Sequence, residues 1–175
     1  LFNINDLILD IVEQQQLNIN PCDFFLYHSC GFESEKAKIK SDKAKIRRIL
    51  GCLVDNAIKF TSEGKVSVGY VVKGDFLEFK VTDTGVGIHA DFHEIIFERF
   101  QQADDTIHTQ YGGNGLGLTI AKAYVELLGG EIWLASLLGK GTSIYFTVPY
   151  VSGNHAVEDP FENVTNSIIP FSNTN

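Results

Sequence analysis

The sequence DNAIKFT at residues 55–61 ends the clearest helix that this 175-residue chain predicts. Apolar residues before it recur every three or four positions, which is the spacing of a helix with one buried face. Asp42 is placed to cap the first turn of this helix. Cys52, Asn56 and Lys59 fall at i, i+4 and i+7, so they form one stripe beside the buried face.

The stripe combines an amide oxygen with an ammonium group. Mg²⁺ is a hard cation that accepts oxygen ligands, and a lysine offsets the charge of phosphates. Asn56 and Lys59 would therefore suit a Mg²⁺–triphosphate. Taken alone, the stripe is explained equally well as a solvated helix flank that happens to carry an asparagine.

Three glycine-rich clusters follow this helix in the sequence. DTGVGI at residues 83–88 leaves a predicted strand, GNGLGL at 113–118 precedes a second helical pattern, and GKGT at 139–142 separates two predicted strands. The second cluster suits a phosphate-binding turn at a helix N-terminus or the hinge of a lid. It is not a Rossmann fingerprint, because no βαβ unit surrounds it. Each cluster on its own is a weak signal.

The remaining pattern predicts a chain of mixed helices and strands. Helical spacing covers residues 3–15 and 116–128, and the second of these helices stops at Gly129-Gly130. Alternating apolar residues predict a hairpin that turns at residues 73–75. Shorter strands are expected at residues 23–28, 38–40, 131–135 and 142–148.

Two segments lack such periodicity. Residues 89–111 are mostly polar, and an interval of this length inside a domain predicts a functional lid or a disordered segment. The glycines at both ends suit a movable lid. Residues 151–175 are rich in Asn, Ser and Pro and predict a linker or a disordered tail.

Composition excludes several classes of protein. The formal net charge of -8 and the absence of a basic stretch with aromatic residues argue against nucleic acid as the ligand. No apolar run is long enough to span a bilayer, and no signal peptide is recognisable, so we expect a cytoplasmic domain without membrane contact. The three cysteines form no CxxC pair, which favours reduced thiols over a metal site.

In this order and spacing, the clusters resemble the sequence boxes of bacterial two-component histidine kinases. Residues 55–61 resemble the N box, and residues 83–88 the first glycine box. IFERF at residues 96–100 resembles the F box. GNGLGL at 113–118 resembles the second glycine box, and GKGTS at 139–143 resembles the last one. The resemblance runs over nearly all of the chain before the tail.

The resemblance implies a fold and a division of the chain. The expected fold is the Bergerat ATP-binding fold of the gyrase, histidine kinase and MutL superfamily. It is an α+β two-layer sandwich, in which helices cover one face of a mixed β-sheet, with a flexible ATP lid. Residues 1–150 would form the histidine kinase catalytic domain, and residues 151–175 the linker or tail.

The resemblance also implies roles for single residues. Asp83 would accept a hydrogen bond from the adenine amino group, which selects adenine over guanine. Asn56 would be the Mg²⁺ ligand and, with Lys59, a catalytic residue, while Phe97 and Phe100 would anchor the lid. The implied ATP-binding set is Asn56, Lys59, Phe60, Asp83, Gly85, Gly87, Ile88, Gly113, Gly115, Leu116, Gly117, Leu118 and Thr142.

Two positions depart from the family's pattern. The N box commonly has a second Asn where this chain has Cys52, and related ATPases such as gyrase have a water-activating Glu there. A thiol is neither a suitable base for water nor a magnesium ligand, so Cys52 argues against an ATP-hydrolysing machine of the gyrase type. Gln102 stands where some members carry an arginine that reaches the γ-phosphate.

The phosphoacceptor histidine of the family is not expected within this chain. His93-Glu94 has a superficial likeness to the acceptor box, but it lies in the predicted lid and lacks the following Arg and Pro. The expected partners are a separate dimerisation and phosphoacceptor domain upstream of Leu1 and the receiver domain of a response regulator. No nucleic acid partner is expected.

Three functions are therefore compared. The leading one is the transfer of the γ-phosphate of Mg-ATP to a histidine on another domain, within a two-component phosphorelay. A catalytically weak nucleotide-sensing module is the second, with Cys52 as its support. The third is a serine kinase of the anti-sigma type, which shares the fold.

Overall fold

A five-stranded sheet forms one layer of the molecule in the computed structural model, which describes residues 1–17, 24–33, 37–98 and 117–150. The strand order is β2-β4-β5-β7-β6. β2 and β4 pair in parallel, and every other neighbouring pair in this sheet is antiparallel. The strands are β2 (Phe24–Ser29), β4 (Gly64–Lys73), β5 (Phe76–Asp83), β6 (Ile132–Leu137) and β7 (Gly141–Pro149).

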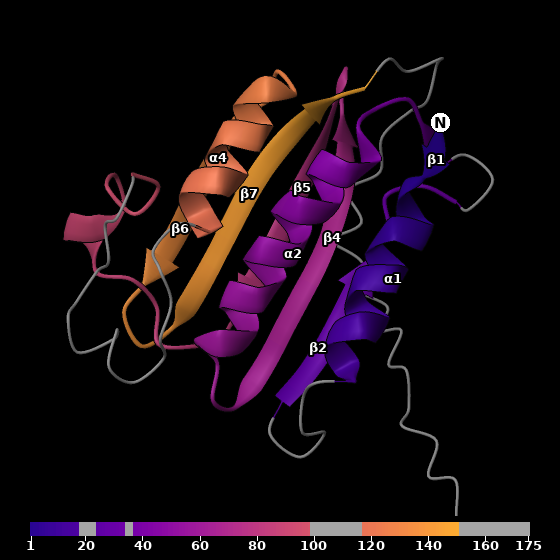
Figure 1. Ribbon diagram of the computed structural model, residues 1–175. Helices are drawn as coiled ribbons and strands as arrows, with labels where there is room; N and C mark the ends of the chain where they lie inside the picture. The colour runs from indigo at the N-terminus through magenta and orange to yellow at the C-terminus, as the bar shows by residue number, and fades with distance from the viewer. Residues whose placement is uncertain (18–23, 34–36, 99–116, 151–175) are drawn as a thin grey trace, which may run out of the picture.

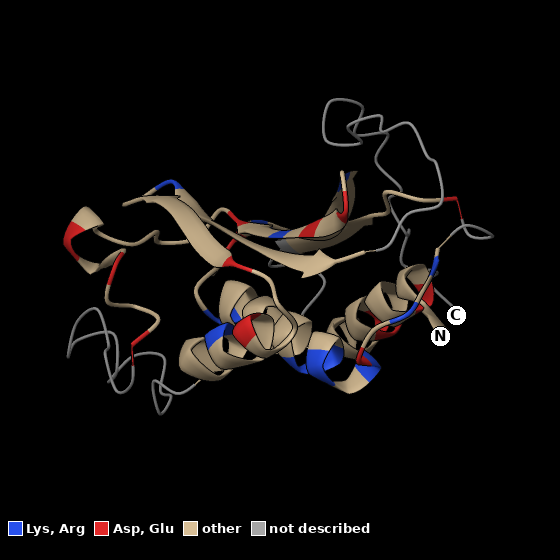
Figure 2. Ribbon diagram, turned by 90° about the horizontal axis from the view of Figure 1, so that it is seen from above, with Lys and Arg blue, Asp and Glu red and all other residues tan. Residues whose placement is uncertain are grey.

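Three helices of the described chain form the second layer, on one face of the sheet (Figure 1). They are α1 (Ile4–Gln16), α2 (Lys43–Lys59) and α4 (Gly117–Leu127). Seen from above, all three lie on the same side of the strands (Figure 2). The predicted two-layer sandwich with a mixed sheet is confirmed.

The helix ends follow local sequence signals. The side chain of Asn3 accepts hydrogen bonds from the amides of Asn5 and Asp6 at the start of α1. Asp42 accepts from the amide of Lys45 at 3.0 Å, as its predicted N-cap role requires. Beyond α4, Gly129 adopts a φ of 80°, a left-handed conformation that ends the helix.

Short elements complete the described chain. β1 (Phe2–Asn3) pairs antiparallel with β3 (Lys38–Ile39), and a 3₁₀ turn, η2, covers Ala90–Phe92. The sequence predicted β3 but not the pairing with β1. No helix in the described ranges combines the length and the apolar character that crossing a membrane demands.

The core lies between the sheet and the helices. Leu77, Phe79 and Val81 of β5 alternate inward, and the rings of Phe79 and Phe146 stack with centroids 4.6 Å apart. Burial of each such side chain contributes about 1.5–3 kcal/mol. The same alternation turns Asp83 of β5 and Thr142 of β7 toward the helix layer, where both are buried. The packing of the core therefore places two polar residues at one end of the sheet.

Candidate nucleotide-binding site

The carboxylate of Asp83 is held at the end of β5 by two backbone amides. Its Oδ1 accepts hydrogen bonds from the amide of Gly85 at 2.9 Å and from the amide of Thr142 at 3.2 Å. Burial raises the pKa of Asp83 above its ordinary value, and the two hydrogen bonds act in the opposite direction. The side chain is thus fixed in orientation by the backbones of a loop and of the neighbouring strand.

Close backbone contacts bring the loop after β5 against the end of α2. The amide of Val86 donates to the carbonyl oxygen of Phe60 at 3.2 Å. A Cβ on Gly85 would collide with that same carbonyl group, so only glycine fits there. Gly87, with a φ of 69°, packs against the backbone of Leu137 in the same way. The two glycines therefore allow the backbone of this loop to pack directly against the backbones of Phe60 and Leu137.

Gly141 closes the same end of the sheet from β7. Its φ is 102°, and a Cβ at this position would collide with the carbonyl oxygen of Asp83. The next residue, Thr142, then donates its amide to the Asp83 carboxylate. The GKGT cluster therefore supports Asp83 directly, a role that the sequence did not predict.

Ser136 connects this site to Ile88, the residue before the predicted lid, and sequence reasoning missed it. Its hydroxyl accepts from the amide of Ile88 at 2.8 Å and donates to the carbonyl oxygen of Gly141 at 2.9 Å. It also lies 2.8 Å from the hydroxyl of Thr142. Ser136 follows Ile132 and Leu134 on the inward face of β6. A polar residue at the third of these alternating positions is the sequence feature that could have indicated its role.

The predicted stripe lies on the second half of α2. Its first residue, Cys52, lies beside the start of α4, and its last residue, Lys59, ends α2. Cys52, Asn56 and Lys59 are all half-buried. The side-chain amide nitrogen (Nδ2) of Asn56 donates to the sulfur of Cys52 at 3.9 Å. The ammonium of Lys59 lies 5.5 Å from the centroid of the Phe60 ring. A Cβ on Gly117, the first residue of α4, would lie 2.8 Å from the sulfur of Cys52. The Cys52 end of the stripe therefore lies against the start of α4, and Lys59 lies beside Phe60, whose carbonyl group contacts the loop after β5.

The Cys52 thiol is neutral near physiological pH. Burial raises the pKa of Cys52 to about 11, with a further contribution from the nearby charge of Asp55. The side chain packs against the edge of the hydrophobic core. A neutral thiol in this place cannot act as the water-activating base that a glutamate would supply.

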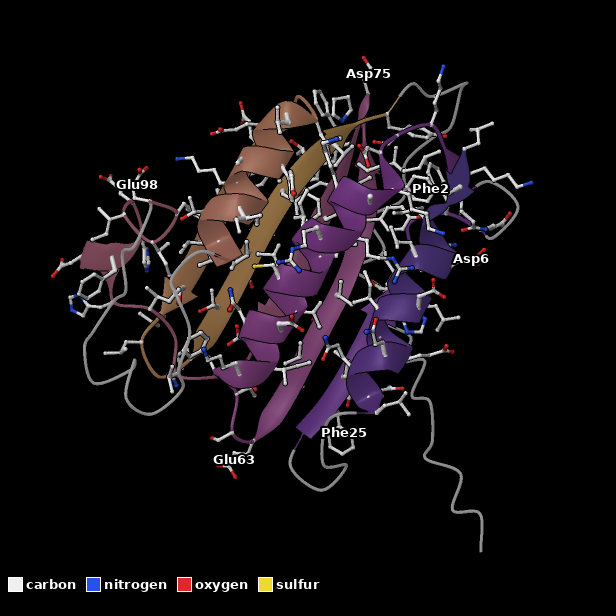
Figure 3. All side chains as sticks on the ribbon, viewed as in Figure 1. Phe2, Asp6, Phe25, Glu63, Asp75 and Glu98 are labelled. Atoms are coloured by element: carbon white, nitrogen blue, oxygen red, sulfur yellow. The ribbon has the colours of Figure 1, made fainter. Side chains whose placement is uncertain are left out.

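Glu98 of the F box, labelled in Figure 3, contacts α4. Phe97 is buried in the core, and its predicted anchoring of the lid stays a prediction. The hydroxyl of Thr119 donates to the backbone oxygen of Glu98 at 3.0 Å, and Lys122 lies 3.3 Å from the Glu98 carboxylate. A ring nitrogen of His93 lies 3.0 Å from the carbonyl oxygen of Ile88, which gives this histidine a structural contact.

Most of the predicted site residues converge, and some are not described. The structure brings together residues from α2, from the loop after β5 and from β7, and Leu118 packs against the core from α4. The predicted site or lid residues Phe100, Gly113, Gly115 and Leu116 lie outside the described residues. Thr142 contacts Asp83 and Ser136, and its predicted approach to the adenine edge stays a prediction.

Comparisons with known proteins agree with this geometry. The family model for histidine kinase-, DNA gyrase B- and HSP90-like ATPases matches residues 41–152. The autoinducer 2 sensor kinase/phosphatase LuxQ of Vibrio vulnificus is 35% identical over 179 residues, covering 86% of this chain and 21% of that protein. The circadian input-output histidine kinase CikA of Synechococcus elongatus is 41% identical over 111 residues, covering 63% of this chain and 15% of that one.

Solved structures show the same fold. Full-length ShkA in complex with AMPPNP superposes with a TM-score of 0.72 at 27% identity, covering 88% of this chain and 31% of that one. The catalytic domain of the histidine kinase ThkA gives a TM-score of 0.72 at 25% identity, covering 85% of this chain and 93% of that domain.

The chain therefore belongs to the family of histidine kinase-, DNA gyrase B- and HSP90-like ATPases. Within this family it is an ATP-binding domain of the sensor histidine kinase type, with the Bergerat fold. It spans about a fifth of the length of LuxQ. The resemblance inferred from the sequence boxes is confirmed.

Proposed function

We propose that this chain binds Mg-ATP and donates the γ-phosphate to a histidine on a separate dimerisation and phosphoacceptor domain. The observation that carries the proposal is the buried carboxylate of Asp83, which the amides of Gly85 and Thr142 orient in an ATPase domain of the histidine kinase type. The names of relatives such as LuxQ and CikA, a sensor kinase/phosphatase and a histidine kinase, support phosphotransfer in two-component signalling.

Asp83 would recognise the adenine base. Both of its hydrogen bonds within the described chain go to Oδ1, so Oδ2 is the oxygen that would accept from the exocyclic amine. Guanine presents an oxygen at the corresponding position, and a carboxylate repels it. Because the two amides already fix the carboxylate, this selection costs little reorganisation on binding.

Asn56 and Lys59 would hold the triphosphate end. The described residues contain no cluster of three or more His, Cys, Asp or Glu side chains that could hold a metal. A cation bound here would therefore rely on an amide oxygen together with oxygens of the nucleotide and water. This donor set fits Mg²⁺, which keeps several waters and binds through few protein groups.

The chemistry would consist of positioning and charge neutralisation. The imidazole nitrogen of the acceptor forms a bond to the γ-phosphorus while the bond to the bridging β–γ oxygen breaks, and ADP leaves with the electron pair. Lys59 would offset charge beside the phosphates, and Asn56 would orient them through the cation. In this scheme residues 1–150 form the catalytic domain and residues 151–175 a linker or tail, and the phosphate passes onward to a receiver domain.

A labelling experiment tests the proposal. The 175-residue chain is incubated with [γ-³²P]ATP alone, and then with the helical hairpin that carries the acceptor, made as a separate polypeptide. We expect label on the hairpin only, stable to base and labile to acid, as phosphohistidine is. An Asn56→Ala chain serves as the control and should transfer far less.

Other outcomes would favour the competing functions. Nucleotide binding without any transfer would indicate a nucleotide-sensing module. Acid-stable label on serine of a partner would indicate a kinase of the anti-sigma type. Stoichiometric labelling of the isolated chain would mean that the acceptor lies within it, with His93 as the first residue to test.

A further inference from the structure

Cys52 contacts Asn56 and Gly117, two residues of the predicted ATP-binding set. Its sulfur accepts a hydrogen bond from the amide nitrogen of Asn56 at 3.9 Å, one helical turn further along α2. On its other side, the sulfur fills the space beside Gly117, where a Cβ would lie 2.8 Å from it. One half-buried thiol thus lies between the proposed metal ligand and the first residue of α4.

The contact with Asn56 places the nitrogen of its side-chain amide against the sulfur of Cys52. A carboxamide carries one oxygen acceptor and one NH₂ donor on opposite sides. When the nitrogen donates to the sulfur, the oxygen is directed away from Cys52. Without an acceptor at position 52, either face of the carboxamide could turn outward, and only one of them can ligate a hard cation.

Sulfur suits this task because it does not compete for the cation. Mg²⁺ selects oxygen ligands and binds neutral sulfur poorly. The thiol therefore accepts from the Asn56 nitrogen without withdrawing the ion from the Asn56 oxygen. The packing against Gly117 restricts the thiol itself, because the start of α4 limits the space in which it can turn.

We propose that Cys52 is a positioning residue that holds the carboxamide of Asn56 with its oxygen toward the metal of Mg-ATP. The inference rests on the proposed function, because it assigns a role in that same site. It gives Cys52 a part in metal binding, whereas from the sequence alone Cys52 supports a catalytically weak nucleotide-sensing module.

The first test observes the Asn56 side chain without any nucleotide. In ¹⁵N-edited NMR spectra of the 175-residue chain, the side-chain NH₂ signals of Asn56 should shift in Cys52→Ala and move less in Cys52→Ser, whose hydroxyl still accepts. Cys30→Ala is the matched control, because Cys30 is also a half-buried free thiol whose pKa burial raises to about 11, and it follows β2. It should leave the Asn56 signals unchanged.

The second test separates metal binding from nucleotide binding. The affinity for ATP is measured in EDTA, and Mg²⁺ is then titrated at a fixed ATP concentration. Cys52→Ala should keep the EDTA affinity and weaken the apparent Mg²⁺ affinity by about three- to tenfold, as the loss of one modest hydrogen bond predicts. Cys52→Ser should recover most of this loss, and Cys30→Ala should match the unaltered chain.

The possible results distinguish failure of the proposed role of Cys52 from failure of the proposed function of the chain. An unchanged Mg²⁺ titration in Cys52→Ala with normal ATP binding would overturn the role of Cys52 and leave the proposed function standing. An equal loss in EDTA and in Mg²⁺ would overturn it too, because it would indicate a packing role only. Absence of ATP binding by the unaltered chain would overturn the proposed function and this inference together.

Discussion

The proposed nucleotide site has a base end at Asp83 and a phosphate end at Asn56 and Lys59, and these two proposed ends are built in different ways. At the base end, the carboxylate of Asp83 is held by backbone amides, and the backbones of Gly85 and Gly141 pack against neighbouring carbonyl groups. At the phosphate end, the side chains of Asn56 and Lys59 project from one helix and are restrained by a weak contact to sulfur and a ring contact. The base end belongs to the sheet, whereas the phosphate end is a set of side chains.

This difference predicts which substitutions affect folding. Replacing a glycine at the base end disturbs the backbone contact between β5 and β7, because Gly141 packs against the carbonyl group of Asp83. A change at the phosphate end removes a side chain from a helix surface and leaves the core intact. Stability and nucleotide affinity should therefore fall together when a base-end glycine is changed, and they should separate when only a side chain proposed to contact the nucleotide is changed.

The largest effect is expected for Gly141→Ala. A Cβ at this position would collide with the carbonyl oxygen of Asp83, and a φ of 102° is strained for any residue with a side chain. Both effects oppose folding. We expect a loss of about 2–5 kcal/mol in the free energy of unfolding, measured by urea denaturation, together with loss of ATP binding. Gly139→Ala is the control, because its φ is 74° but no atom lies within 4 Å of the added Cβ. Equal losses in both variants would mean that the close approach to Asp83 has no energetic weight.

A smaller effect, confined to binding, is expected for Asp83→Asn. The amide oxygen can still accept from Gly85 and Thr142, while the new NH₂ group faces the adenine amine as a second donor. We expect ATP affinity to fall by about 1.5–3 kcal/mol, or roughly 10- to 150-fold, in calorimetric titrations. Asp75→Asn, an exposed carboxylate in the turn after β4, should change nothing.

The raised pKa of Asp83 predicts how stability and ATP affinity change with pH. Burial raises its pKa, so the folded state favours the protonated form, and the stability that protonation contributes is lost as pH rises through the raised pKa. At neutral pH the Asn variant should therefore be at least as stable as the unaltered chain in thermal unfolding. ATP affinity of the unaltered chain should fall as pH drops through that raised pKa, and the Asn variant should lack this dependence.

The smallest effect is expected for Lys59→Gln. A half-buried ammonium at the end of α2 offsets phosphate charge but makes no contact that supports the sheet. We expect ATP affinity to fall by about 0.5–1 kcal/mol, adenosine affinity to stay unchanged, and stability to change by less than about 0.5 kcal/mol. Lys43→Gln at the exposed start of α2 is the control. A matching loss of adenosine affinity would place Lys59 at the base end and remove the distinction between the two ends.

Local patterns predicted most of the elements. Alternation predicted the β4–β5 hairpin, and the three-to-four spacing with Asp42 predicted α2, because these periods reflect burial on one face. The β1–β3 pairing was missed, because two-residue strands carry too few alternating residues to show a period. Ser136 was missed because a single serine in a strand has a role only when its neighbours in space are known.

The sequence by itself determined the family, because the boxes carry the residue types that this chemistry needs, and it predicted the residues that would contact ATP. Only the tertiary structure decided how these residues are supported. The contact of Gly141 with Asp83 joins residues 58 positions apart, and the contact of Cys52 with Gly117 joins two helices. Such contacts depend on strand register and helix packing, which the spacing of residues along one chain does not record.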